Sequence, residues 1–309
     1  MKNIILGGNG MIGVNLSKLL LKRGEETIII DREFRQEYES PNTNFLKADL
    51  VDEKERVFEW VDWHFGEDDE LGVWHLAANS DIRSGTEDLF VDFKDTLGTT
   101  ITAIEICKRN RANFLGFSSS SAIYGDKKGA PVDELSIQLE PISNYGLMKL
   151  WSEKLILDFM SQNNDIQILI YRFPNVVGHP LTHGIIKDLL EKLKIEPEEV
   201  EVLGNGMQRK QYVHVEDLID IIYSLKSLGQ SGIFNIAPND DGVSVKQISE
   251  MLRSAISPGT NLNFGLTDYG WKGDVPVYRL DTTKLRKTGL GNTLDSLSSI
   301  QRTIMEIEY

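Results

Sequence analysis

The sequence predicts an α/β fold, in which a doubly wound parallel sheet is joined to a smaller C-terminal domain. The first observation is a set of short, almost wholly apolar runs that read as strands, at residues 3–6, 27–30, 71–76, 113–117 and 166–171. The second is that helical patterns such as MIGVNLSKLLLKRG separate these runs. Strands that are apolar on both faces and alternate with helices are typical of a parallel sheet covered on both sides.

The regular alternation ends near residue 174. Beyond it, turn sequences such as GHP, GNG and APNDDG interrupt short apolar segments. We therefore expect residues 1–173 to form the first domain and residues 174–309 to form mainly the second. One segment, residues 209–231, reads as a strand and a helix that return to the first domain.

Composition narrows the classes of function. The chain has 309 residues and a formal net charge of −14, which argues against nucleic acid or an anionic membrane as the main partner. Its one cysteine, Cys107, excludes an internal disulfide, and the spacing of the histidines suggests no metal site. Because no apolar run is long enough to span a membrane, we expect a cytoplasmic protein.

The first apolar run leads into a glycine turn and a helix. Gly7, Gly10 and Gly13 follow one another at three-residue spacing. Glycine allows the tight turn, the approach of a pyrophosphate to the main chain, and close packing of helix on strand. The N–H groups of Met11 and Ile12 would then point at phosphate from a helix N-terminus. This pattern predicts a dinucleotide-binding site.

The next strand ends in Asp31, 18 residues after Gly13. A carboxylate at this position accepts hydrogen bonds from the adenosine ribose and repels a 2′-phosphate, which favours NAD over NADP. Arg32 beside it is the counterargument, since an arginine can hold that phosphate. It can equally be a solvated loop charge.

Further along, Tyr145 and Lys149 lie four residues apart in a helical pattern, so their side chains share one face. An ammonium beside a phenol favours the phenolate and lowers the pKa of the tyrosine. Such a tyrosine can take or return the proton of a substrate hydroxyl during hydride transfer.

Taken together, these stretches resemble the extended short-chain dehydrogenases/reductases, in particular the nucleotide-sugar epimerase/dehydratase family, whose members include UDP-glucose 4-epimerases. The resemblance covers essentially the whole chain, and it rests on GGNGMIG, KADL, WHLAANSDIR, FSSSSAIYGD, NYGLMK, YRFPNVVG, LGNGMQRKQYVHVEDL and GWKGDVP. It implies a Rossmann domain that binds NAD, a C-terminal domain that binds a nucleotide-diphosphate sugar, and a homodimer.

The resemblance also implies roles for single residues. Besides the glycine turn and Asp31, the residues implied to border NAD are Arg32, Asp49, Leu50, Leu76, Ala77, Ala78, Ser118, Tyr145, Lys149 and Phe173. The residues implied to bind the substrate are Asn175, Arg209, Lys210 and Asp274, with Lys272 a nearby cation. Lys210 stands where many members have arginine, and lysine lacks the bidentate fork that grips a phosphate. Two further positions have open roles: Asp95, where the family commonly has asparagine, and His183.

Four serines follow the 113–117 strand, and the family pattern selects one of them. The catalytic Ser or Thr lies four residues before the tyrosine of the motif that here reads IYG, and counting back from Tyr124 gives Ser120. Ser118 would share its strand face and line the cofactor side, whereas Ser119 and Ser121 would be structural. Members that eliminate water carry an Asp-Glu pair directly after the catalytic residue. This chain has Ser121 and an alanine there, so we expect no 4,6-dehydratase.

The expected activity is NAD-dependent oxidoreduction at C4 of a nucleotide-diphosphate sugar, catalysed by Ser120, Tyr145 and Lys149, with 4-epimerisation as the leading hypothesis. A nucleotide-sugar 4-dehydrogenase or 4-ketoreductase would share the first half-reaction and release its product without epimerising. A non-catalytic NAD-sensing protein is the hypothesis from another class. Such proteins typically lose the tyrosine–lysine pair, which is intact here.

Overall fold

The structure is a computed structural model that describes residues 1–34, 43–66, 69–79, 82–196, 198–271 and 273–307. Contacts divide the chain into two compact units. Unit 1 comprises Met1–Ser119, Leu147–Arg172 and Ile219–Phe234. Unit 2 comprises Ser120–Gly146, Phe173–Leu218 and Asn235–Tyr309.

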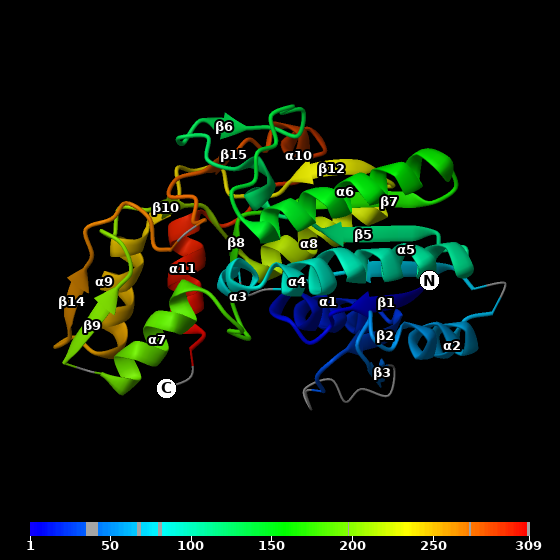
Figure 1. The fold of residues 1–309 in the computed structure, drawn as a ribbon, viewed down its shortest axis with the longest axis horizontal. Helices are drawn as coiled ribbons and strands as arrows, with labels where there is room; N and C mark the ends of the chain where they lie inside the picture. Colours follow the sequence, from blue (N-terminus) through cyan, green and yellow to red (C-terminus); the bar gives the residue numbers. More distant parts are fainter. Residues whose placement is uncertain (35–42, 67–68, 80–81, 197, 272, 308–309) are drawn as a thin grey trace. The chain divides into compact units, whose positions relative to one another are not determined.

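Unit 1 is built on a seven-stranded sheet with the order β12-β7-β5-β4-β1-β2-β3 (Figure 1). The pairs from β3 across to β7 run parallel. The strands are β1 (Lys2–Leu6), β2 (Glu26–Asp31), β3 (Thr43–Lys47), β4 (Leu71–His75), β5 (Phe114–Ser118), β7 (Gln167–Arg172) and β12 (Gly232–Asn235). This confirms the predicted doubly wound α/β fold, because the central strands are buried along their whole length.

Helices connect these strands, as the sequence indicates. They are α1 (Met11–Lys22), α2 (Lys54–His64), α3 (Ile82–Glu87), α4 (Leu89–Asp92), the π-helix η2 (Phe93–Gly98), α5 (Thr99–Arg109), α6 (Asn144–Gln162) and α8 (Val215–Ser227). In Figure 1, α5 and α6 run side by side, and Thr100 Oγ1 donates a hydrogen bond of 2.9 Å from α5 to Ser152 on α6. Cys107 on α5 is 2% exposed within the core of this unit, and burial raises the pKa of its thiol.

Unit 2 contains shorter elements. They are the 3-10 helix η3 (Ser121–Tyr124), β6 (Pro131–Val132), β8 (Asn175–Val177), α7 (Ile185–Ile195), β9 (Glu199–Val202), β10 (Arg209–Lys210), β11 (Tyr212–His214), β13 (Val243–Ser244), α9 (Val245–Ile256), β14 (Asn261–Phe264), β15 (Arg279–Leu280), α10 (Thr283–Lys287) and α11 (Ser296–Met305). Its strands form two-stranded sheets, in which β11 pairs with β8 and not with the sheet of unit 1. An apolar core of its own lies between α7, α9 and α11 and the strands β9 and β11.

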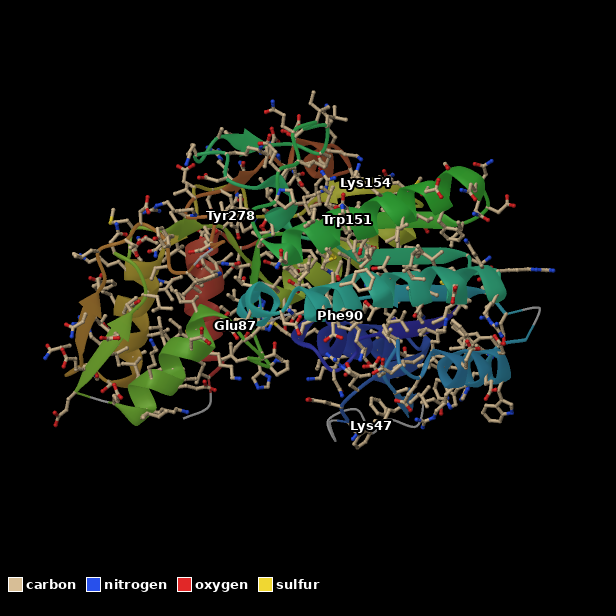
Figure 2. The ribbon with its side chains drawn as sticks, in the orientation of Figure 1. Lys47, Glu87, Phe90, Trp151, Lys154 and Tyr278 are labelled. Atoms are coloured by element: carbon tan, nitrogen blue, oxygen red, sulfur yellow. The ribbon has the colours of Figure 1, made fainter. Side chains whose placement is uncertain are left out.

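Several large apolar side chains of unit 1 stay at the surface. Phe90 and Phe93 stack with ring centroids 5.9 Å apart, and both are exposed. On α6, Trp151 and Leu155 are exposed, whereas Leu150 and Phe159 are buried. Figure 2 shows Phe90 and Trp151 on the same side of unit 1. Exposed apolar groups gathered in this way are typical of an interaction surface.

Candidate active site

In the turn between β1 and α1, the structure leaves no room for a side chain at two of the predicted glycines, Gly7 and Gly13. Gly7 has a φ of +81°, and a Cβ added there would lie 2.7 Å from Ala77 Cα, just after β4. A Cβ at Gly13 would lie 2.6 Å from Gly8 Cα. Both distances are far below contact, so the turn can pass β4 and pack on α1 only with glycine at these positions.

Gly10 is different, because the protein leaves room for a side chain there. Its backbone angles, φ −72° and ψ 166°, suit any residue, and the atom nearest to an added Cβ is Gly7 O at 3.7 Å. Helix α1 begins at the next residue, Met11, with no acidic side chain in its first turn. A bare surface in front of a helix N-terminus suits a pyrophosphate, so the residues present fit the predicted dinucleotide.

Gly10→Ala should therefore separate cofactor binding from folding. We expect the melting temperature of the apo protein to stay near that of the wild type, while the Kd for NAD rises by about tenfold or more, because the methyl group occupies the approach of the pyrophosphate. Gly13→Ala is the matched comparison and should lower stability as well. Calorimetric titration and thermal unfolding measure the two effects, and unchanged NAD affinity in Gly10→Ala would contradict the assignment.

Asp31 ends β2 beside the glycine turn. One oxygen of its carboxylate accepts the N–H of Asn9 at 2.8 Å, and the other accepts the N–H of Glu33 at 3.2 Å. A carboxylate has about four acceptor sites, so capacity remains for the ribose hydroxyls of its predicted role. Asp31 thus also holds the glycine turn, a task that the spacing alone did not indicate.

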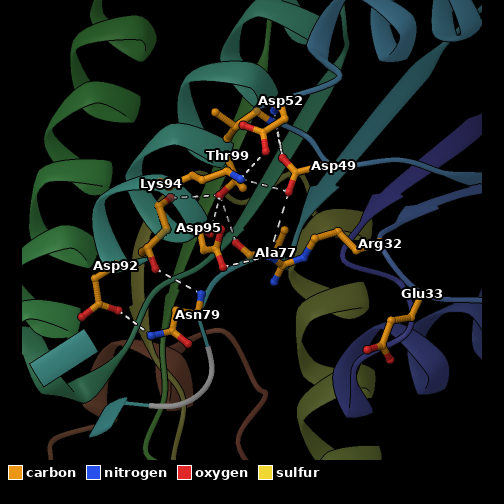
Figure 3. Close-up of polar contacts among 12 residues, drawn as sticks. Arg32, Glu33, Asp49, Asp52, Ala77, Asn79, Asp92, Lys94, Asp95 and Thr99 are labelled. Atoms are coloured by element: carbon orange, nitrogen blue, oxygen red, sulfur yellow. Dashed lines mark hydrogen bonds and ion pairs between the residues drawn. The ribbon is translucent and has the colours of Figure 1, made fainter. Parts of the chain in front are cut away.

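A network of charges surrounds Arg32 (Figure 3). Arg32 Nη1 donates to Asp95 Oδ2 at 2.9 Å and lies 4.0 Å from Asp49 Oδ2. Lys94 Nζ lies 3.5 Å from the same Asp49 oxygen and pairs with Asp52 at 2.5 Å. Two residues whose roles the sequence left open, Arg32 and Asp95, are therefore partners of one another.

Asp49 belongs to this network and lies in the loop that follows β3. Burial works to raise the pKa of Asp49, but the N–H groups of Asp52 and Val51, helped by Lys94 and Arg32, lower it overall. Its carboxylate is therefore ionised at neutral pH.

Six further residues that are predicted to border NAD fall into two groups. Leu50 and Met11 are buried, so their side chains belong to the core and their main chains are what a ligand can reach. Ile12, Leu76, Ala77 and Ala78 are half-buried. Leu76 continues the β4 ladder through an N–H bond of 2.9 Å to Leu6 O.

Three of the four serines are enclosed. Ser118, Ser119 and Ser121 are all less than a tenth exposed. Ser118 donates to the carbonyl of His75 at 3.2 Å, and Ser119 donates to the carboxylate of Glu153. These contacts bind the hydroxyls of Ser118 and Ser119 to the protein itself.

Ser120 is the half-buried member of the run. Its Oγ caps η3 by accepting the N–H of Ala122 at 3.1 Å. The first turn of α6 packs directly on η3, because a Cβ at Gly146 would lie 2.8 Å from Ala122 O. Tyr145, the residue before this glycine, is therefore held in the neighbourhood of Ser120, as the predicted catalytic roles of the two residues require.

Lys149 lies one turn after Tyr145 on α6 and is buried. Its Nζ donates to the carbonyl of Ser118 at 2.5 Å and lies 4.8 Å from the centre of the Phe117 ring. Burial lowers the pKa of Lys149 to about 7, although the carboxylate of Glu153 opposes that shift. A lysine that titrates near neutrality can hold or release a proton under working conditions.

Behind Lys149 lies a buried ion pair that the sequence did not reveal. Glu153, one turn further along α6, accepts Arg172 Nε at 3.0 Å and Arg172 Nη2 at 2.7 Å. Both side chains are no more than 2% exposed. Together with Ser119 they tie α6 to the ends of β5 and β7, and this fixes the strand end that precedes Ser120.

Unit 2 holds the predicted substrate residues. Asn175 begins β8 and accepts the hydroxyl of Tyr278 at 3.3 Å. Lys210 on β10 is ion-paired with Asp274 and lies 5.2 Å from the centre of the Trp271 ring. The structure thus brings two of the predicted residues, Lys210 and Asp274, into contact with each other.

Arg209 points to neutral groups instead. Its Nη1 donates to Gly242 O at 2.8 Å, and no carboxylate of the described residues forms an ion pair with it. Among the described residues its charge therefore has no carboxylate partner, in contrast to that of Lys210. Lys272 lies outside the described residues.

For two other predicted residues, Phe173 and His183, the contacts of the described residues indicate no chemical role. Phe173 is half-buried, and its carbonyl accepts the N–H of Ser121 at 3.0 Å. His183 is exposed and shares a hydrogen bond of 2.9 Å with Thr182.

Sequence reasoning missed Tyr278 and Trp271, which touch Asn175 and Lys210. Trp271 stands inside the GWKGDVP stretch and could have been singled out as an aromatic beside a cation. Tyr278 carries no local signal, because its partner lies about a hundred positions earlier in the chain.

Neither a membrane span nor a metal cluster is found where the structure is described. Within these ranges, no helix combines the length and the apolar character that crossing a bilayer demands. Nor do the same residues contain a group of three or more histidine, cysteine and carboxylate side chains that could hold a metal ion.

The chain is similar to several curated epimerases. It is 29% identical over 255 residues to a UDP-glucose 4-epimerase of Lacticaseibacillus casei, covering 75% of each protein. It is 27% identical over 298 residues to a probable UDP-arabinose 4-epimerase 3 of Arabidopsis thaliana, covering 84% of this chain and 70% of the relative. A crystal structure of a UDP-galactose 4-epimerase, 28% identical, superposes with a TM-score of 0.83 over 99% of this chain and 98% of its own.

A family model spans most of the chain. Residues 3–237 match the model of the NAD dependent epimerase/dehydratase family, from β1 and the glycine turn through α6 to the end of β12. This match confirms the predicted family and the predicted cofactor, NAD, for which the glycine turn has room. The chain belongs to the NAD dependent epimerase/dehydratase family.

Proposed function

We propose that the protein is a nucleotide-sugar 4-epimerase. The observation that carries this proposal is the intact Tyr145–Lys149 pair on α6, whose first turn is seated on the η3 turn that Ser120 caps. The names of the relatives, UDP-glucose, UDP-galactose and UDP-arabinose 4-epimerases, support the same reaction and make UDP-sugars the first substrates to test.

The residues would divide the chemistry as follows. Bound NAD would supply the hydride chemistry at C4 of the sugar. Tyr145 takes the proton of the C4 hydroxyl, Ser120 hydrogen-bonds the same oxygen, and Lys149 supplies the positive charge that favours the phenolate.

The proposed substrate residues would hold the nucleotide. Arg209 and Lys210 are the cations for the diphosphate, with Asn175 as a donor through its amide and Asp274 as the partner that positions Lys210. Arg209 can approach an anion at once, whereas Lys210 must share its charge with Asp274.

The test is to incubate purified protein with UDP-, GDP-, dTDP- and CDP-sugars and to follow products by mass spectrometry and NMR. A 4-epimer of one of these sugars, formed without net consumption of NAD, is the expected result. Accumulation of a 4-keto sugar, with one NAD reduced for each ketone released, would identify a nucleotide-sugar 4-dehydrogenase or a 4-ketoreductase running in reverse. Tight NAD binding without turnover of any sugar would favour a non-catalytic NAD sensor.

We also predict a homodimer, formed through the exposed apolar side chains of η2, α4 and α6. Light scattering at micromolar concentration should report about twice the 34.9 kDa of one chain. Trp151→Glu should give the monomer, because it places a charge at an exposed apolar position, one turn from Leu155 and on the side of unit 1 that also carries Phe90. Trp63, 80% exposed on α2, gives a matched control, and Trp63→Glu should stay dimeric. A monomeric wild type would refute the prediction.

A further inference from the structure

We propose that Asp95 sets the preference for NAD over NADP by holding Arg32 away from the 2′-phosphate position. The proposal concerns the cofactor of this chain and does not depend on which sugar it converts. It starts from the position of Arg32, which directly follows the ribose-binding candidate Asp31 at the end of β2. An arginine at such a position can grip a 2′-phosphate, because its planar fork matches phosphate oxygens.

The structure gives that arginine a different partner. Arg32 Nη1 lies 2.9 Å from Asp95 Oδ2, and the second carboxylate, that of Asp49, lies 4.0 Å away (Figure 3). The positive charge of Arg32 is thus balanced by carboxylates of the protein itself. A 2′-phosphate would have to compete with Asp95 for the same N–H donors.

Of the two partners, Asp95 is the fixed one. Its side chain is 16% exposed, against 56% for Arg32. It stands in the first turn of the π-helix η2, an element that is frequent at functional sites. The next element is tied to it, since Thr99 Oγ1 donates to the carbonyl of Asp95 at 3.0 Å. A long side chain held by an anchored carboxylate can be released by removing that carboxylate.

The remaining charges do not favour a phosphate either. Lys94, the other cation of this cluster, is engaged by Asp49 and Asp52. Together with Asp31 and Asp95, the carboxylates outnumber the cations of the cluster by four to two. A phosphate dianion placed here meets net negative charge, whereas the free 2′-hydroxyl of NAD does not.

The competing explanation is that the Arg32–Asp95 pair merely ties β2 to η2. The two explanations predict different results for Asp95→Asn, which keeps the shape of the side chain and removes its charge. A tie that is weakened should reduce the affinities for NAD and NADP by the same factor. Release of Arg32 should raise the affinity for NADP relative to that for NAD.

Calorimetric titration of the apo protein with NAD and with NADP decides between them. We expect Asp95→Asn to shift the ratio of the two Kd values toward NADP by about tenfold, since one like charge is lost and one arginine is freed. Asp52→Asn is the matched control: it removes a carboxylate from the same cluster that contacts Lys94 and not Arg32, and it should keep the wild-type ratio.

Arg32 provides the second arm. The double variant Asp95→Asn with Arg32→Gln should lose the gain for NADP, because the gain belongs to the released guanidinium. Arg32→Gln alone should leave the NADP affinity of the wild type unchanged, and this variant decides the question even if Asp95→Asn does not fold. Equal changes for both cofactors in Asp95→Asn, a gain that survives without Arg32, or weaker NADP binding in Arg32→Gln would each overturn the proposal.

Discussion

Tyr145→Phe should leave almost no turnover while NAD affinity is retained. The substitution removes a single oxygen, from the group that we propose moves the C4 proton, and it keeps an aromatic ring in the first turn of α6. Because general acid–base assistance contributes roughly 10²–10⁴-fold, we expect a loss in kcat at the upper end of this range. Single-turnover reduction of bound NAD by the true substrate measures it.

The serines provide the internal comparison. Ser120→Ala should slow the same step substantially, but less than Tyr145→Phe does. Ser119→Ala and Ser121→Ala should remain within a few-fold of the wild-type rate, with Ser118→Ala between them. The environments support this order, since the hydroxyls of Ser118 and Ser119 are already bound to His75 and Glu153. A loss in Ser121→Ala as large as that in Ser120→Ala would show that the count from Tyr124 selects the wrong serine.

Among the single substitutions considered, Arg172→Met should lower the free energy of unfolding the most. It leaves the carboxylate of Glu153 almost fully buried without its cation. Breaking a buried ion pair on one side typically costs about 3–5 kcal/mol of the free energy of unfolding. Urea denaturation of the apo protein measures the loss.

Two further variants make this prediction specific. Replacing both partners, Glu153→Leu with Arg172→Met, should recover much of the loss, because no unpaired charge remains. Arg109→Met breaks a pair with Asp62 that is nearly half exposed, and it should change stability little. If Arg172→Met is no more harmful than Arg109→Met, the buried pair does not hold α6 to the strand ends.

The sequence predicted those parts of the fold whose signal is local. The strands β1, β2, β4, β5 and β7 each have a neighbouring strand on both sides and are buried on both faces, and so they stand out as apolar runs. The two edge strands were not predicted. β3, with the sequence TNFLK, contains only two adjacent apolar residues, too short a run to stand out as a strand, and β12 is only four residues long.

The candidate site divides in the same way. The glycine turn and the Tyr145–Lys149 pair depend on spacings of three and four residues, which a sequence displays directly. The Arg32–Asp95 pair spans 63 positions, and Glu153 and Arg172 are 19 apart on different elements. No sequence periodicity connects such residues, because they come into contact only when their separate helices and strands pack together. The carboxylate at position 95 could be seen as unusual, but its partner could not be identified.

The burial of Cys107 has a practical consequence for spectroscopy. Its thiol is enclosed in the core of unit 1 and stays protonated, whereas maleimides and nitroxide reagents react with accessible thiolate. Since it is the only cysteine of the chain, a thiol introduced at the surface would be modified selectively in an otherwise unaltered background. Trp63→Cys on α2 would place one spin label on each subunit, and the distance between the two labels would then map the proposed dimer in solution.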